Sequence, residues 1–334
     1  MSNAAGLGWG ILATGYIAEI FTRDLRDAGL RVAAVASRSE ERARAFAAEH
    51  GIPNAHGSLE GLVADPTVDV VYVATPHPFH AEGALLALEH GKHVLVEKAF
   101  TLNAAEAETI AAKGRERGLV VLEAMWTRFL PHMIEIRALL ADGAIGRPQV
   151  LIADHMQALP TDPAHRINAP ELGGGALLDL GVYPLSFGVD LFGLPVDVRA
   201  AATFTGTGVD ERVSATLVHS GGEHTVFTAA LNLPGPNRAV IVGTEGSITI
   251  DTTWYMPTGY TVWNAEREAV RRSRPEVSGR GMQFQAFELE ALVRDGRTGS
   301  DRLPPEESVG IMAVMDRIRE QIGLVYPGEP SPAG

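Results

Sequence analysis

Apolar residues in the first third of the chain gather in short continuous runs, and the stretches between these runs have helical spacing. The runs are rich in Val and Ala, which is typical of strands buried on both faces of a parallel sheet. We predict strands at residues 9–12, 31–36, 69–74, 94–98 and 119–123. The intervening patterns predict helices that end near residue 25 and that cover residues 42–50, 58–63, 81–90 and 103–117. Strands that alternate with helices predict a doubly wound parallel sheet of the Rossmann type.

The second half of the chain has a different pattern, in which polar and apolar residues alternate over long stretches separated by hairpin turns. Such alternation is typical of antiparallel strands with one face in a core and the other toward solvent. We predict these strands at residues 199–207, 212–219, 223–231, 238–242 and 247–251. The change of pattern predicts two domains, residues 1–125 and residues 126–334, and 334 residues are enough for both.

The predicted strand Val94–Lys98 ends in an adjacent acid and base, Glu97 and Lys98. Open α/β sheets bind their ligands at the carboxyl ends of the strands, so this pair is a candidate for the functional site. The alternative is a strand that enters solvent with two charged residues, which is common at strand ends. The pair alone does not decide between these interpretations.

The turn after the first strand reads A-x-G-x-x-A, with Ala13 at the position where dinucleotide-binding turns usually have their first glycine. Small residues there allow the backbone to approach a pyrophosphate, and the helix amino end supplies N–H groups. A plain tight turn is the alternative, and the alternating strands and helices favour the dinucleotide site. The candidates for cofactor binding are Ala13, Thr14, Gly15, Tyr16 and Ile17.

Ser37 and Arg38 follow the second strand, where such domains place the residue that contacts the cofactor ribose. A serine and an arginine offer hydrogen-bond donors and positive charge to the extra phosphate of NADP, so we predict NADP, with NAD as the other possibility. Ser37 and Glu40 also match a helix capping box, and the two roles are compatible.

The third predicted strand leads into a loop that contains two prolines, which fix the backbone. We predict that this loop forms one wall of a cofactor cleft, with Thr75, Pro76 and His80 as candidates. The residues alone give no chemical role to either histidine of the loop.

A glycine-rich segment at residues 172–184 separates the two patterns. Helical spacing after the glycines places Asp179 and Tyr183 on one face, one turn apart. Gly181 and Pro184 both weaken a helix, and a purely structural helix has little reason to contain both. A buried tyrosine bonded to an aspartate is also a common packing arrangement, so both interpretations remain open.

Composition excludes several classes of function. The net charge of -13 argues against nucleic acid as a partner, because nucleic-acid-binding proteins usually have a clustered basic excess. The absence of cysteine excludes disulfides, thiolate metal sites and a cysteine nucleophile, and we predict no metal site. We find no apolar run near the roughly 18 residues of a membrane span and no signal-peptide pattern, so we expect a cytoplasmic protein without a membrane partner.

In combination, GILATGYIA, VLVEKAFTLNAAEAE, EAMWTRFLP, ELGGGALLDLGVYP, VGTEGSI and IREQIGLVYP resemble the Gfo/Idh/MocA oxidoreductase family, and within it the branch of dihydrodiol dehydrogenases and NADP-dependent D-xylose dehydrogenases. The resemblance extends from about Gly8 to Pro327. It implies an α/β fold with an amino-terminal Rossmann domain and a carboxyl-terminal α/β domain for substrate binding and dimerisation. The second domain would have an open, mostly antiparallel sheet, and we expect a homodimer.

The resemblance also implies roles for individual residues. Glu97 and Lys98 match the E-K-P motif of the family with Ala99 in place of the proline, so Lys98 would be the active-site lysine. Asp179 and Tyr183 match the D-x-x-x-H/Y positions. The positions near the nicotinamide half of the cofactor are matched by Trp126 and Arg128, and less clearly by Arg166.

These assignments predict a proton-transfer reaction. Oxidation of a hydroxyl requires a base while hydride leaves, and a free tyrosine with a pKa of about 10 is too protonated at neutral pH to act as one. A cation such as Lys98 would stabilise the phenolate of Tyr183, and Asp179 would position Tyr183 or Lys98, or bind the substrate. We therefore expect a dehydrogenase or reductase that acts on a sugar, polyol or diol.

Two alternatives remain from sequence alone. The first is another redox task, such as anhydrosugar reduction or nicotinamide-assisted glycoside cleavage, and the second is a non-catalytic NADP-binding sensor. A sensor needs no proton-transfer group, so Lys98, Asp179 and Tyr183 argue against it. Substrate specificity is expected in residues 154–171, in residues 254–263 and around Phe284.

Overall fold

The computed structural model describes residues 6–329, and the chain divides into two compact units. The first unit contains the chain through Thr101, then Ala105–Trp126 and Ser278–Val309. The second contains Leu102–Ala104, Thr127–Val277 and the chain from Gly310. A change of unit at residues 126–127 lies close to the expected domain boundary. Residues 278–309, however, group with the first unit, although the sequence analysis assigned them to the second domain.

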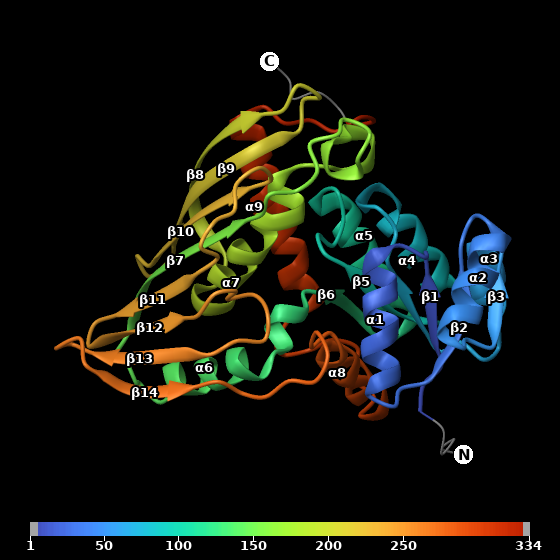
Figure 1. Ribbon diagram of the computed structural model, residues 1–334, viewed down its shortest axis with the longest axis horizontal. Coiled ribbons are helices and arrows are strands. Elements are labelled where there is room, and N and C mark those ends of the chain that lie inside the picture. The colour runs from blue at the N-terminus through green and yellow to red at the C-terminus, as the bar shows by residue number, and fades with distance from the viewer. Residues whose placement is uncertain (1–5, 330–334) are drawn as a thin grey trace. The chain divides into compact units, whose positions relative to one another are not determined.

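The first unit is built on a parallel sheet of six strands in the order β3-β2-β1-β4-β5-β6 (Figure 1). The predicted Rossmann-type sheet is therefore confirmed, and its strands are β1 (Trp9–Leu12), β2 (Val32–Ala36), β3 (Asn54–His56), β4 (Val70–Val73), β5 (His93–Glu97) and β6 (Val121–Ala124). The strand β3 was not predicted, because its three half-buried residues form no apolar run. The other strands are buried over most of their length, as their Val-rich runs predict.

Helices connect the strands of the first unit: α1 (Tyr16–Asp27), α2 (Glu40–His50), α3 (Leu59–Ala64), α4 (His80–Glu89) and α5 (Ala104–Arg117). The cap of α2 is Ser39, whose side chain accepts a hydrogen bond from the Arg42 N–H. The proposed capping box of Ser37 and Glu40 is therefore wrong, because the helix begins two residues later than that pattern requires.

Residues 278–309 add the helix α8 (Gln283–Arg294) to the first unit, where it packs against α1. Asp24 of α1 accepts hydrogen bonds from the backbone N–H groups of Arg280 and Met282 just before α8 begins. Trp9 of β1 also donates its indole N–H to Glu290 of α8 at 2.9 Å. These long-range bonds attach a segment that is distant in sequence to the first strand and helix.

The second unit contains a sheet of eight strands in the order β14-β13-β12-β11-β7-β10-β9-β8. The strands are β7 (Pro148–Met156), β8 (Pro195–Phe204), β9 (Asp210–His219), β10 (His224–Ala230), β11 (Ala239–Gly243), β12 (Gly246–Ile250), β13 (Tyr260–Asn264) and β14 (Ala269–Ser273). Neighbouring strands pair antiparallel except β7 and β10, so the predicted mostly antiparallel sheet is confirmed. The predicted strands did not include β7, β13 and β14.

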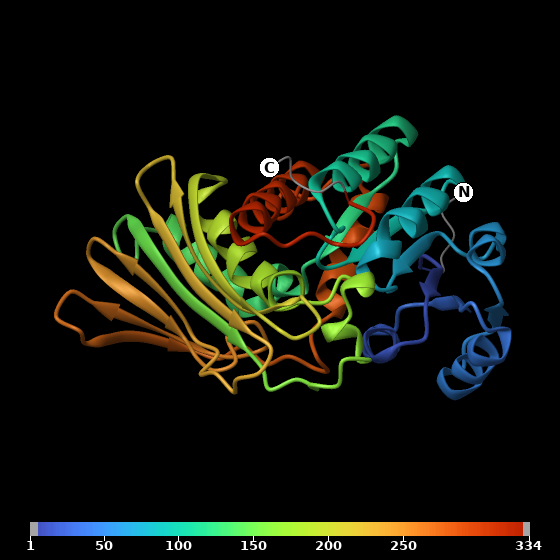
Figure 2. The same cartoon turned by 90° about the horizontal axis from the view of Figure 1, so that it is seen from above.

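One face of this sheet carries helices, among them α6 (Pro131–Ala141) and α7 (Val182–Phe192), and Figure 2 shows the sheet as a curved layer. Buried Leu151 and Ala153 alternate along β7 with Ile152, which is 51% exposed on the other face. The sheet therefore has a covered face and an open face, as the polar and apolar alternation indicates.

The helical stretch Pro170–Phe192 is long and apolar enough to cross a membrane by length and composition, although the sequence analysis found no such run. In the structure 83% of its apolar window is buried inside the protein. A buried core helix of a globular protein meets the same criterion, so this stretch is weak support for a membrane span.

Candidate active site

The predicted cofactor residues follow the carboxyl ends of neighbouring parallel strands. Leu12 at the end of β1 is in register with Ala36 of β2 and with Val73 of β4. On the other side, Val73 is in register with Val96, and Glu97 with Ala124. The segments that begin at residues 13, 37, 74, 98 and 125 therefore lie along one edge of the sheet, where this class of fold binds ligands.

The turn after β1 leaves the amino end of α1 open. Gly15 is the N-cap of α1 and has no side-chain cap bond, whereas serine side chains cap α2 and α3. A Cβ at Gly15 would find nothing within 4 Å, and its φ of -83° suits any residue, so the fold itself does not require glycine there. Close approach of a phosphate would require it, and exposed helix N–H groups provide the donors.

Ala13 has a φ of +97°, a left-handed conformation that favours glycine. This is the position at which the sequence has alanine in place of the usual first glycine. The turn is nevertheless formed, with the Ala13 N–H donating to the carbonyl of Ala36 at 2.9 Å. The single methyl group is therefore accommodated in a strained backbone conformation.

Arg38 is exposed beyond the end of β2, and its guanidinium lies over the ring of Phe79 at 6.0 Å from the centroid. Phe79 belongs to the loop after β4, so the two side chains come from strands on both sides of β1. The Ser37 hydroxyl accepts a hydrogen bond from the Ser39 N–H at 3.4 Å. A cation at this place can meet a phosphate on the ribose of a bound dinucleotide.

The loop after β4 is fastened by His80, which is buried. One ring nitrogen of His80 lies 2.8 Å from the Thr75 carbonyl, and the other lies 3.0 Å from the Ala99 carbonyl. Burial lowers the pKa of His80 to about 3, so the ring is neutral at physiological pH. The side chain therefore connects the loop of Thr75 and Pro76 to the residue after Lys98, and contributes to the site by holding these two segments.

Glu97 is buried at the end of β5 and binds two groups of the first unit. The Tyr72 hydroxyl donates to one carboxylate oxygen, and the Lys98 N–H donates to the other at 3.2 Å. His77 contacts the Lys98 carbonyl at 3.3 Å. These contacts fix the backbone of Lys98, whose side chain is half-buried.

Trp126 follows β6 and is buried, with the Arg280 guanidinium over its ring at 5.4 Å from the centroid. Arg128 belongs to the second unit and is 2% exposed. Its guanidinium forms an ion pair with Asp190 at 3.0 Å and donates to the Ser186 carbonyl at 2.7 Å. These bonds hold Arg128 against α7, and its expected place beside the nicotinamide stays a prediction.

Asp179 and Tyr183 lie on consecutive helical segments of the second unit, the π-helical turn Leu177–Gly181 and α7. The predicted helix is present, but the turn that carries Asp179 is π-helical and therefore wider than a regular α-helical turn. Pro184 supplies no backbone N–H, which is a reason for the ladder to change here. Arg166 binds the carboxylate of Asp179 through two nitrogens, at 2.9 and 3.2 Å.

Tyr183 is 7% exposed and packs in an aromatic cluster with His155 and Tyr255. The centroid of its ring lies 4.8 Å from that of His155 and 5.3 Å from that of Tyr255. His155 and Tyr255 stack on each other at 3.8 Å. These two residues were not singled out from the sequence, although the segments 154–171 and 254–263, which contain them, were expected to set specificity.

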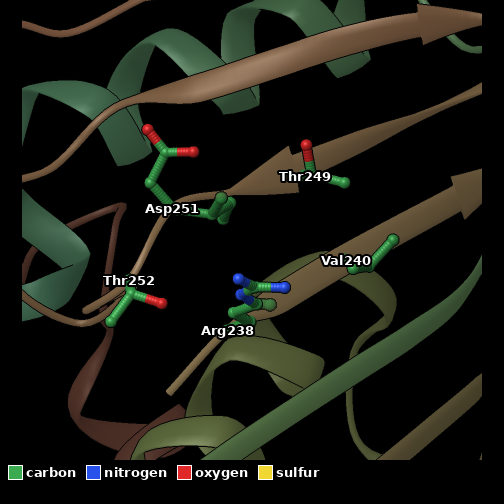
Figure 3. Close-up of a pocket in the computed structure, with 7 residues that line it drawn as sticks. Arg238, Val240, Thr249, Asp251 and Thr252 are labelled. Carbon is green, nitrogen blue, oxygen red and sulfur yellow. The ribbon is translucent and has the colours of Figure 1, made fainter. Parts of the chain in front are cut away.

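A pocket of about 490 Å³ lies at the ends of β11 and β12 in the second unit (Figure 3). It is lined by Arg238, Ala239, Val240, Thr249, Ile250, Asp251 and Thr252. None of the predicted site residues lines this pocket, so it is not part of the candidate active site.

Known proteins resemble this chain over nearly its whole length. Residues 7–125 match an oxidoreductase family with an NAD-binding Rossmann fold, and residues 133–249 match the GFO/IDH/MocA C-terminal domain. The chain is 37% identical over 332 residues to trans-1,2-dihydrobenzene-1,2-diol dehydrogenase of Danio rerio, covering 96% of this chain and 98% of that protein.

Two solved structures extend the comparison. An aldose-aldose oxidoreductase from Caulobacter crescentus, complexed with glycerol, has a TM-score of 0.85 at 25% identity and covers 95% of this chain and 97% of its own. A 3-ketoreductase from Actinomadura kijaniata, in complex with NADP and TDP-benzene, has a TM-score of 0.82 at 26% identity, covering 95% of this chain and 98% of its own.

Proposed function

This chain belongs to the Gfo/Idh/MocA oxidoreductase family, and on that premise we propose that Tyr183, assisted by Lys98, is the acid/base for hydride exchange between a sugar, polyol or diol hydroxyl and NADP. The protein is a dehydrogenase that acts on CH–OH groups and binds a nicotinamide cofactor. The finer assignment rests on residues of the two units described above.

The placement of Tyr183 carries this proposal. Its phenol is almost buried among His155 and Tyr255, and Asp179 nearby is already held by Arg166. A packed ring has few orientations, so its hydroxyl is preorganised for proton transfer. The nearly buried phenol and its aromatic neighbours also suit a diol or sugar ring, which presents both apolar faces and hydroxyl groups.

Each residue has a defined task in the proposed reaction. The phenolate of Tyr183 takes the proton of the substrate hydroxyl as the carbon loses its hydride, and neutral Tyr183 returns a proton in the reverse direction. The ammonium of Lys98 stabilises the phenolate by its charge. The nicotinamide, when bound, accepts or donates the hydride. Asp179 fixes Arg166 and the turn before Tyr183.

The residues of the first unit support NADP as the cofactor. The open amino end of α1 suits the pyrophosphate, and Arg38 supplies a cation beyond β2. No acidic side chain follows β2 at the positions of Ser37 and Arg38, where NAD-specific sites have a carboxylate for the ribose hydroxyls.

A substrate panel tests the proposed function. We expect NADP+ to be reduced in the presence of trans-1,2-dihydrobenzene-1,2-diol, D-xylose or a related sugar or polyol, measured by NADPH absorbance. The Tyr183→Phe variant is the control, because it keeps the ring and removes the hydroxyl. Tight NADP+ binding without turnover on any member of the panel would instead identify a sensor. Turnover on anhydrosugars or glycosides alone would indicate another redox task of the family.

A further inference from the structure

Asp210 is a buried carboxylate that the proposed mechanism does not use. It is the first residue of β9 and is 0% exposed. Its Oδ2 accepts a hydrogen bond from the Leu177 N–H at 2.6 Å, and its Oδ1 has no hydrogen-bond partner among the described residues. Leu177 begins the π-helical turn that contains Asp179 and leads directly into Tyr183. A carboxylate from a distant strand therefore occupies the amino end of the helical run that carries both residues.

The segment before Leu177 is shaped around this carboxylate. Gly175 has a φ of +127°, and a Cβ built there would lie 2.0 Å from Asp210 Oδ1, so both conformation and space require glycine. Tyr326 donates its hydroxyl hydrogen to the Gly174 carbonyl at 2.9 Å. The two consecutive residues Gly174 and Gly175 are thus held between Asp210 and Tyr326.

We propose that Asp210 is a positioning residue, which sets the place of Asp179 and Tyr183 by holding the backbone N–H at the start of their helical run. This inference rests on the function proposed above, because the position of Tyr183 matters only if its hydroxyl transfers a proton. A small displacement of a reacting group lowers turnover more than it lowers binding. Loss of Asp210 should therefore reduce kcat and leave cofactor affinity unchanged.

The charge of Asp210 adds a pH dependence to this role. The pKa of Asp210 is raised to about 7, mainly by burial and also by the nearby Asp179, although hydrogen bonds from backbone N–H groups, including those of Leu177 and Ala176, act in the opposite direction. Among the described residues, Tyr326 also lies in this region, together with Arg166, which pairs with Asp179, and Arg319, which pairs with Glu329. An ionised carboxylate accepts a stronger hydrogen bond and interacts favourably with the helix amino end. The hydrogen bond from the Leu177 N–H to Asp210 therefore becomes stronger as the pH rises through about 7.

Asp210→Asn tests the proposal, because it removes the charge and keeps the size of the side chain. We expect faster amide hydrogen exchange in residues 174–183 and a kcat about 10-fold lower, with the Kd of NADP+ unchanged, which is the scale of one lost charge-assisted bond. Oxidation of trans-1,2-dihydrobenzene-1,2-diol by NADP+ is the assay. In the unmodified enzyme its kcat should rise through a step near pH 7 in addition to the rise that ionisation of Tyr183 gives, and only the step near pH 7 should disappear in the variant.

Two further variants complete the experiment. Asp24→Asn is the matched control, because Asp24 is also buried and binds backbone N–H groups before a helix, but α8 carries none of Lys98, Asp179 and Tyr183. This control should leave the step in kcat near pH 7 unchanged, and it should leave the amide hydrogen exchange of residues 174–183 unchanged. Tyr326→Phe releases the Gly174 carbonyl and should increase exchange in the same segment, which keeps the proposal testable if Asp210→Asn does not fold.

Unchanged exchange of residues 174–183 in Asp210→Asn would overturn the proposal. Hydrogen exchange requires no substrate, so this result does not depend on the proposed reaction. Failure of the proposed function itself would appear differently, as full turnover by Tyr183→Phe.

Discussion

Backbone strain at a single residue marks the cofactor turn. Ala13 adopts a φ of +97°, which is unfavourable for a residue with a Cβ by roughly 1–3 kcal/mol. Glycine at this position relieves the strain. Its more flexible unfolded state, however, lowers the free energy of unfolding by about 0.5–1 kcal/mol. We expect Ala13→Gly to raise Tm by a few degrees and to preserve NADP+ binding, as measured by calorimetry. A lower Tm would show that the methyl group makes a packing contact that outweighs the strain.

We expect Arg38 to determine the choice between NADP and NAD. Its guanidinium lies over the ring of Phe79, near the end of β2. In this class of site, the extra phosphate of NADP lies at the end of that strand. Arg38→Ala should narrow the preference for NADP by about 1.5–3 kcal/mol, the scale of a hydrogen bond to a charged group. Titration of the unmodified protein and the variant with both cofactors measures the difference. Equal affinity of the unmodified protein for NADP and NAD would contradict the assignment.

The proposed acid/base is Tyr183, with Lys98 as its partner. Tyr183→Phe keeps the packed ring but removes the hydroxyl, so kcat should fall by about 100-fold or more while the Kd of NADP+ changes little. Lys98→Met should also lower kcat, and the double variant should lose much less than the product of the two single effects, because the residues share one step. Steady-state kinetics of the three variants checks this. Near-full activity of Tyr183→Phe would place the base elsewhere.

At the scale of elements, His132 connects α6 to the segment after β12. A ring nitrogen of this buried histidine lies 3.1 Å from the Trp254 carbonyl, and burial lowers the pKa of His132 to about 4. Unfolded histidine has a pKa near 6.5, so the unfolded state binds the proton first as the pH falls. The folded protein should therefore lose up to about 3 kcal/mol of stability from this group between pH 6.5 and 4.

The variant His132→Gln tests this expectation, because glutamine can still donate to the Trp254 carbonyl but does not titrate. Its free energy of unfolding should fall less than that of the unmodified protein when the pH decreases from 6.5 to 4. Urea unfolding at several pH values measures both slopes. Equal slopes would show that His132 does not contribute to acid sensitivity.

At the scale of the whole molecule, the open face of the second sheet is the proposed homodimer interface. Ile152 of β7 pairs with Val226 of β10, and Val150 of β7 pairs with Val242 of β11. Ile152, Val226 and Val242 are all exposed, so the three strands present a continuous apolar patch. Apolar patches on a sheet face are typical of surfaces covered by a partner, and a second copy of the chain fits the expected dimer.

Light scattering at micromolar concentration should therefore give the mass of a dimer. Ile152→Lys places a charge in the middle of the patch and should shift the protein toward monomer. Val270→Lys is the matched control, because Val270 is 59% exposed on the edge strand β14 and lies outside the three strands of the patch. A monomeric unmodified protein, or equal effects of both substitutions, would contradict the interface.

The sequence by itself determined five of the six strands of the first sheet and the segments that follow them. Val94–Glu97 and Val70–Val73 are continuous buried strands, and local periodicity is enough to recognise such runs. Once the strands are parallel, their carboxyl ends must share one edge, which brings the turns at Gly15, Arg38 and Lys98 to it. The prediction of a cofactor-binding turn therefore followed from the residues around Gly15, whereas the role expected for Lys98 came from the resemblance to the family.

Only the tertiary structure decided the contacts between segments that are distant in sequence. Residues 278–309 group with the first unit through bonds to Asp24 and Trp9, which no local pattern indicates. The burial of Arg128 against Asp190 and the bond from Leu177 to Asp210 likewise depend on partners far along the chain. A hydrophobic pattern indicates which face of an element is buried. It does not indicate which polar group from a distant segment forms a hydrogen bond or ion pair with that element.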